Sequence, residues 1–177
     1  MNHSASSLDA VLKHYHKQLN ERLLLQQDAL IDKNITLALQ LFCQFQLLMT
    51  DHLRVENLIL LPLHTEIENV RWPSSLYKLE HNKIIKLMSK AELQLRSAQR
   101  HKNTDCRRDI VEIIDYQRTL KGVLEHHEAR EEQGLLAELT QHLCNETQQQ
   151  IAHYCHQHWQ GLFEIHPVFY KKSLAGC

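Results

Sequence analysis

The sequence predicts an all-helical protein, built as an up-down-up-down four-helix bundle with one additional helix at its C-terminal end. Of its 177 residues only four are glycine and three are proline, whereas the two types together average roughly 12%. Sheet proteins use these residues in many tight turns. The low glycine and proline content therefore favours long helices with short connections, and such helices pack as antiparallel neighbours. We expect one domain over 1–177, with the bundle over about 8–143.

Charge and cysteine content narrow the class of protein. The 20 lysine and arginine residues balance 21 aspartate and glutamate residues, so electrostatics gives no reason to expect nucleic acid or an anionic membrane as a partner. The five cysteines show no C-x-x-C spacing, and no signal-peptide pattern or membrane-spanning apolar run is present. We therefore expect a reduced, cytoplasmic protein. The unusual count is histidine, with 14 residues.

Apolar residues at helical spacing predict the first two helices. Ser6-x-x-Asp9 forms a capping pattern before the first apolar stripe, which predicts a helix over 8–30. After a short polar turn, a second stripe predicts a helix over 35–61. Pro62 is expected to kink or end this second helix.

Three further helices follow. Ser74 or Ser75 can cap the third helix. The polar stretch 101–105 predicts a loop, and a fourth helix continues until Asn145 interrupts it. A fifth helix, weaker in pattern, is predicted over about 145–163.

Two H-x-x-x-E motifs lie in the second and fourth helices, as His52 with Glu56 and His127 with Glu131. Residues four apart share one helical face, and here that face is the apolar stripe of each helix. Burying an ionised carboxylate in an apolar core is unfavourable unless a positive group meets it. No lysine or arginine lies on either stripe at that level. A bound cation is the natural partner.

The first and third helices each add one histidine on an apolar stripe. In the third helix it is His81. In the first helix His14 and His16 point about 200° apart, so only one of them can face inward. His16 is favoured, because apolar residues lie at the same offsets around it as around His81. His16 lies 36 residues before His52 in the first half of the chain, and His81 lies 46 residues before His127 in the second half. The extra residues are expected in the loop or at the start of the fourth helix.

Imidazole and carboxylate ligands without a thiolate favour iron or manganese over a structural zinc ion. Two bridging carboxylates and four imidazoles leave two six-coordinate metal ions short of ligands, with room for an oxo or hydroxo bridge and a small molecule. The sequence thus predicts two iron ions, with manganese as the alternative, held by one set of residues: His16, His52, Glu56, His81, His127 and Glu131.

Around these residues the sequence resembles the hemerythrin-like, or HHE cation-binding, domain family, and the resemblance covers roughly residues 8–143. The resemblance implies a four-helix bundle that holds a non-haem di-iron centre bridged by both glutamates. Oxygen-carrying hemerythrin has a second histidine in its third helix where this sequence has Ile85, which weakens the case for reversible oxygen carriage. Three segments carry the resemblance: His52-x-x-x-Glu56-Asn-Leu-Ile-Leu-Leu-Pro62, Leu79-Glu80-His81-x-x-Ile84 and His127-x-x-x-Glu131-Glu132.

We therefore expect a di-iron protein that binds or senses a small ligand such as oxygen, nitric oxide or peroxide. One alternative is an enzyme on the same scaffold that turns over these molecules or donates iron to damaged iron–sulfur centres. Another is a metal-free, histidine-rich interaction bundle. Ferritin-like chemistry needs Glu-x-x-His on two helices, and no glutamate here has a histidine three residues later.

Several other residues leave alternatives open. Tyr116 is either a neighbour of the metal site or an ordinary core tyrosine. Four residues of the fifth helix could hold a further metal ion, although a polar surface is favoured: His153, Cys155, His156 and His158. Four histidines are expected to face solvent: His64, His101, His142 and His166.

Overall fold

The computed structural model describes residues 7–100 and 106–165. These residues form helices and no strand, which confirms the prediction of an all-helical chain. None of the helices described is long and apolar enough to cross a membrane. The elements, of which η1 and η2 are π-helical turns, are α1 (Leu8–Ile31), α2 (Ile35–Val55), η1 (Glu56–Leu60), α3 (Leu61–Thr65), α4 (Ser74–Arg100), α5 (Arg107–Arg130), η2 (Glu131–Leu135), α6 (Leu136–His142) and α7 (Asn145–Ile165).

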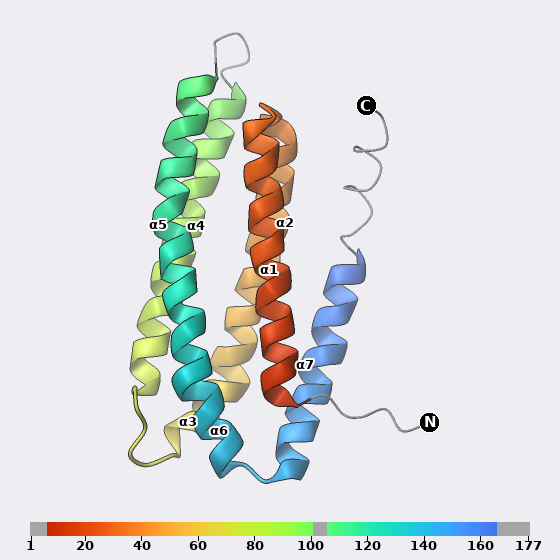
Figure 1. Ribbon diagram of the computed structural model, residues 1–177, viewed down its shortest axis with the longest axis vertical. Helices are drawn as coiled ribbons and strands as arrows, with labels where there is room; N and C mark the ends of the chain where they lie inside the picture. Colours follow the sequence, from red (N-terminus) through yellow and green to blue (C-terminus); the bar gives the residue numbers. More distant parts are fainter. Residues whose placement is uncertain (1–6, 101–105, 166–177) are drawn as a thin grey trace.

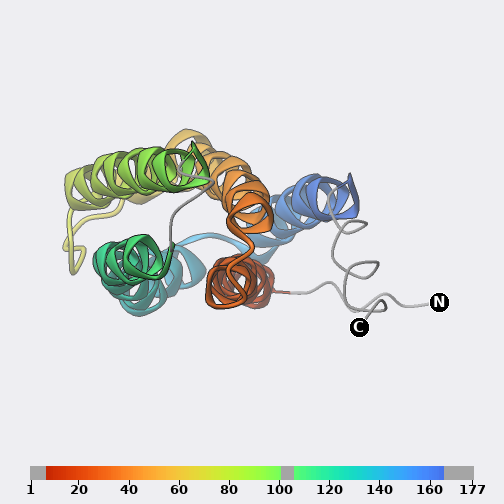
Figure 2. The same ribbon diagram turned by 90° about the horizontal axis from the view of Figure 1, so that it is seen from above.

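The long helices lie side by side as a bundle (Figures 1 and 2). Helix α1 packs on α2, α2 on α4, and α4 on α5, while α5 and α6 contact α1. Each long helix contributes a fully buried apolar side chain to the shared core, and each such burial stabilises the fold by about 1.5–3 kcal/mol: examples are Leu19, Phe45, Ile84 and Leu120. Helices α4 and α5 extend about one turn further beyond His81 and His127 than α1 and α2 extend beyond His16 and His52. Much of the longer spacing between His81 and His127 is therefore helical.

Side-chain caps fix where the first two helices begin. Ser7 Oγ accepts the backbone N–H three residues on, at 3.2 Å, and so caps α1. The expected cap, Ser6, lies outside the described residues. Asn34 Oδ1 caps α2 in the same way, at 3.0 Å.

Pro62 does not end the second helix. The chain stays helical through η1 and α3 as far as Thr65. In η1 the N–H of Leu61 reaches back five residues to the carbonyl of Glu56, and Pro62, which has no N–H, comes directly after this switch. The expectation that Pro62 could end the helix is wrong, because the wider turn has already displaced the backbone hydrogen bonds at that point.

The second π turn, η2, repeats this pattern. The N–H of Leu136 reaches back five residues to the carbonyl of Glu131. Tyr77 lies across the same turn, where its hydroxyl accepts from the N–H of Leu135 at 3.0 Å and donates to the carbonyl of Arg130 at 3.3 Å. The tyrosine therefore satisfies backbone groups that the wider turn frees.

The π turns overturn one expectation about exposure. A π turn holds one residue more than an α turn, so each later residue is displaced by one position around the axis. His64, expected to face solvent, is fully buried, and its ring contacts Ser74 Oγ at 2.9 Å and Glu138 Oε2 at 2.6 Å. His142 does face solvent. The remaining two lie outside the described residues: His101 and His166.

Helix α7 packs against α1 beside the bundle (Figure 1). Cys155 and Trp159 are buried against the bundle, and the Trp159 ring stacks on Tyr15 with 4.1 Å between ring centroids. The fifth helix is therefore held by an apolar contact with the first.

The polar residues of α7 point elsewhere. His153 and His156 are exposed, whereas His158 Nε2 lies 2.7 Å from Asp51 Oδ2 on α2. Within the described part of the chain these side chains do not join Cys155 in a group that could hold a metal ion. The preferred interpretation of this segment as a polar surface holds for the two exposed histidines.

Replacing Gly134 tests how tightly η2 is packed. A Cβ at this position would lie 2.6 Å from Tyr77 Oη and 2.8 Å from the Trp72 ring, so we expect Gly134→Ala to lower the free energy of unfolding by about 1–3 kcal/mol. Gly122→Ala is the matched control, since its Cβ would meet nothing within 4 Å and should stabilise the helix by up to about 1 kcal/mol. Denaturant unfolding of both variants measures this. Equal stability of Gly134→Ala and the parent chain would contradict the packing described.

Candidate metal centre

A group of six histidine and glutamate side chains lies inside the bundle, at the level where the two π turns begin. Each of these residues is at most 3% exposed. They come from α1, from the junction of α2 and η1, from α4, and from the junction of α5 and η2. The structure therefore brings together all six residues singled out in the sequence: His16, His52, Glu56, His81, His127 and Glu131.

The two H-x-x-x-E motifs place each histidine beside its own glutamate. His52 Nε2 lies 2.8 Å from Glu56 Oε1, and His127 Nε2 lies 3.2 Å from Glu131 Oε1. Both contacts follow from the four-residue spacing, because residues i and i+4 lie one above the other on a helix.

Contacts between helices connect each glutamate to both halves of the bundle. Glu56 turns Oε1 to His52 and Oε2 to His81, which is 3.2 Å away. Glu131 turns Oε1 to His127 and Oε2 to His16, also 3.2 Å away. We call His16 with His52 the first histidine pair, and His81 with His127 the second. Each glutamate therefore faces both pairs.

Two overlapping groups of possible ligands result. The first histidine pair with both glutamates forms one group, and the second pair with the same glutamates forms the other. In each group the ligand atoms all lie within 4.8 Å of one another. Within the first pair, His16 Nε2 lies 3.1 Å from His52 Nε2.

The polar atoms at the centre fit a metal ion better than they fit one another. Both oxygens of Glu56 and Glu131 and the Nε2 atoms of His81 and His127 have no aligned hydrogen bond among the described residues. Buried charged atoms without partners are strongly unfavourable. Two ligand atoms about 2.1 Å from one ion and at right angles are about 3 Å apart. The histidine–glutamate distances of 2.8–3.2 Å lie close to that spacing.

The glutamates make this interior attractive to positive charge. Burial alone would raise the pKa of Glu56, but His52, His127 and His81 outweigh it and hold that pKa well below its ordinary value. Burial would lower the pKa of His127, yet Glu131 and Glu56 raise it to about 9. Protons and metal ions therefore compete for the same imidazole nitrogens.

Polar side chains orient the second histidine pair from outside. His81 Nδ1 lies 3.1 Å from Asn57 Oδ1, and His127 Nδ1 lies 3.2 Å from Glu80 Oε2. An amide oxygen and a carboxylate oxygen only accept hydrogen bonds, so each ring donates from Nδ1. This tautomer turns the lone pair of Nε2 toward the centre.

Aromatic rings, in contrast, pack on His52 of the first histidine pair. The Nδ1 atoms of His16 and His52 have no hydrogen-bond partner in the described part of the chain. Tyr15 stacks on the His52 ring at 5.2 Å between centroids, and Trp159 lies 5.4 Å from the same ring. Aromatic packing therefore takes the place of a hydrogen bond at Nδ1 of His52.

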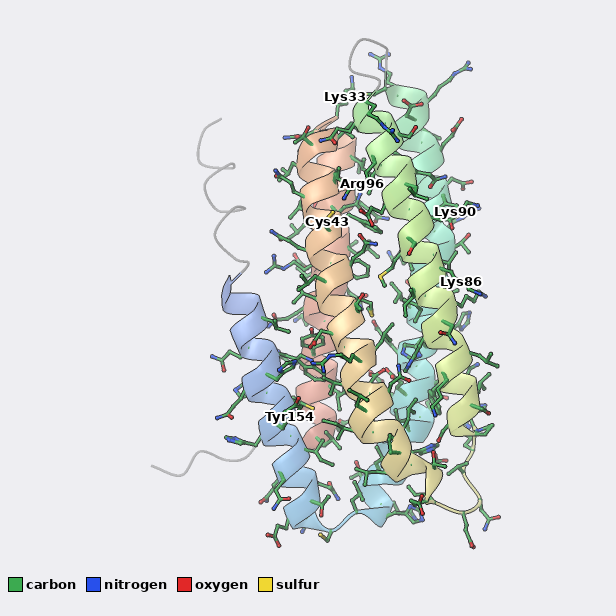
Figure 3. The ribbon with its side chains drawn as sticks, turned by 180° about the vertical axis from the view of Figure 1, so that it is seen from behind. Lys33, Cys43, Lys86, Lys90, Arg96 and Tyr154 are labelled. Carbon is green, nitrogen blue, oxygen red and sulfur yellow. The ribbon has the colours of Figure 1, made fainter. Side chains whose placement is uncertain are left out.

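The structure decides between the alternatives that the sequence left open for the first helix and for Tyr116. His14 is exposed and lies 2.7 Å from Gln18, so His16 is the histidine of α1 that faces the group. The Tyr116 ring on α5 packs under the ammonium group of Lys90, which lies 4.8 Å from the ring centroid. Figure 3 shows Lys90 on α4, and Tyr116 is not among the described residues that contact the six ligand candidates.

Sequence reasoning missed four residues that contact the ligands. Asn57 and Glu80 are chain neighbours of Glu56 and His81 in the quoted motifs, and Tyr15 precedes His16, so adjacency was an available signal. Trp159 carried none, because its contact depends on how α7 packs. The four are Asn57, Glu80, Tyr15 and Trp159.

The donor set defines what the group could bind. Four imidazoles and two carboxylates suit iron, manganese and other first-row divalent metal ions, whereas magnesium and calcium prefer oxygen ligands alone. No family model, curated protein or solved structure matches this chain. The case for a metal site therefore depends on the convergence, burial and orientation of these side chains.

Adding and removing metal should change the stability of the fold. We expect iron(II), added anaerobically, to raise the unfolding temperature relative to protein in excess chelator. An ion at 100 times its dissociation constant stabilises the folded state by about 2.7 kcal/mol. Glu131→Ala should lose most of this increase, because Glu131 faces both histidine pairs, and His142→Ala, which changes an exposed histidine, should keep it. Circular dichroism during heating measures the shift, and an undiminished shift in Glu131→Ala would show that the ion binds elsewhere.

Proposed function

We propose that this chain is a hemerythrin-like, non-haem di-iron protein whose helices form an up-down-up-down four-helix bundle with α7 added outside it. It binds or senses a small ligand such as oxygen, nitric oxide or peroxide. One observation carries the proposal: the two oxygens of each glutamate face different histidine pairs. A carboxylate in that position is suited to bridge two ions.

The residues of this chain would have distinct tasks. Each histidine pair would supply two neutral nitrogen ligands to one ion, and Glu56 and Glu131 would supply a bridging negative charge to both. Two divalent ions carry more positive charge than two carboxylates neutralise, so an additional anionic ligand is favoured. Bound iron supplies open coordination positions and a change of oxidation state.

The surroundings of the six residues support a small ligand. Every one of these residues is at most 3% exposed, so a bulky substrate has no open approach to them. The aromatic wall around His52, made by Tyr15 and Trp159, excludes water from that side. Burial of this kind suits a ligand of two or three atoms.

Metal analysis of anaerobically purified protein tests this function. We expect two irons per chain, and visible absorption from an oxo-bridged diferric form once the protein is exposed to oxygen. Glu131→Ala should lose most of the iron, because Glu131 faces both histidine pairs and removal of a ligand also leaves a buried charge unpaired. His16→Ala should lose the iron of the first histidine pair. His14→Ala, with an exposed imidazole removed two residues away, should keep both irons.

Ligand addition then distinguishes binding from turnover. We expect nitric oxide or peroxide to change the visible spectrum stoichiometrically, with one ligand per di-iron centre. Sustained consumption of these molecules with a reductant would identify an enzyme instead. Two manganese ions would correct the metal but keep the site, and equal, negligible metal in the parent chain and in Glu131→Ala would leave a metal-free interaction bundle.

A further inference from the structure

We infer that the two metal positions are unequal, and that the second histidine pair, His81 with His127, holds its ion first and more tightly because Glu80 positions His127. The inference depends on the proposed two-metal site, but not on which metal occupies it. Glu80 acts through His127 and is a positioning residue.

The bridging glutamates do not themselves favour either position. Glu56 and Glu131 each turn one oxygen to each histidine pair, at 2.8–3.2 Å. The four histidines are equally buried, at 1–3% exposure. A difference in affinity must therefore come from what contacts the outer nitrogen, Nδ1, of each ring.

Hydrogen bonds hold the second pair from outside. Glu80 accepts from His127 at 3.2 Å, and Asn57 accepts from His81 at 3.1 Å. A carboxylate at Nδ1 fixes the ring orientation and makes Nε2 a stronger donor to a metal ion. Loss of such a partner typically weakens metal binding 10- to 100-fold.

Glu80 is itself held in place. It forms an ion pair with Arg130, and the Arg130 guanidinium lies over the Trp72 ring at 5.3 Å. Only 15% of the Glu80 side chain is exposed. The carboxylate is therefore held in position before any ion arrives, which lowers the conformational cost of binding there.

The first pair has no equivalent support. Nδ1 of His16 and of His52 lacks a hydrogen-bond partner among the residues described, and the neighbours of His52 are the rings of Tyr15 and Trp159. Stacking fixes the ring plane but does not increase the basicity of Nε2. An ion that enters here second also meets the repulsion of the first ion.

A cobalt(II) titration against a competing chelator tests the inference. We expect two binding steps in the parent chain. Glu80→Gln should weaken the tighter step about 10- to 100-fold and leave the weaker step within about twofold. Glu80→Asp, which keeps the charge, should recover part of the loss. Glu92→Gln is the matched control, since Glu92 also lies on α4 and pairs with Arg96 rather than with a histidine of the group; it should change neither step.

Variants that keep one histidine pair assign the effect to a position. In a His52→Ala background only the second pair is complete, and Glu80→Gln should weaken the remaining cobalt site. In a His127→Ala background only the first pair is complete, and Glu80→Gln should have no effect. Far-UV circular dichroism checks the fold of each variant, and if a histidine variant does not fold, the two-step titration of Glu80→Gln alone still decides.

The outcomes separate this inference from the proposed function. Two cobalt ions that bind with no change in either step on Glu80→Gln would overturn the inference and leave the two-metal site standing. An equal weakening in the His127→Ala background would also overturn it. Fewer than two cobalt ions in the parent chain would overturn the two-metal site itself.

Discussion

Two carboxylates inside an apolar bundle impose the constraint on which the rest of this structure depends. Glu56 and Glu131 are at most 1% exposed, and removing an ionised carboxylate from water costs several kcal/mol unless positive charge compensates it. In this chain four imidazoles surround the carboxylates, with their inner nitrogens turned to the same centre. Helix packing, ring orientation and the proposed chemistry all follow from satisfying these two charges.

The backbone participates in this arrangement. Each glutamate is the first residue of a π turn, and such turns recur at functional sites because they re-aim side chains within a helix. In the second half, Tyr77 satisfies the backbone groups at the turn, and Arg130, directly before the same turn, pairs with Glu80. The second π turn, Glu80 and His127 are therefore linked to one another through Arg130. In the first half, the rings of Tyr15 and Trp159 pack on His52 instead.

Much of this could be predicted from the sequence, and the failures have a physical cause. Apolar stripes of period 3.6 predicted the helices, and H-x-x-x-E within those stripes predicted the inward-facing group, because both depend only on regular helical geometry. The extra residue of a π turn interrupts that geometry, so the burial of His64 was not predicted, and the sequence left open whether the helix continues past Pro62. Contacts between distant segments were also missed, as with Trp159 beside His52, since spacing within one helix does not specify how another helix packs on it.

The most direct test of the central claim is anomalous X-ray diffraction at the iron absorption edge, from crystals of protein purified with iron. We predict two anomalous peaks between Glu56 and Glu131, one beside each histidine pair. A single peak, or peaks only at exposed residues such as His153 and His156 of α7, would show that paired metal ions do not neutralise the buried carboxylates.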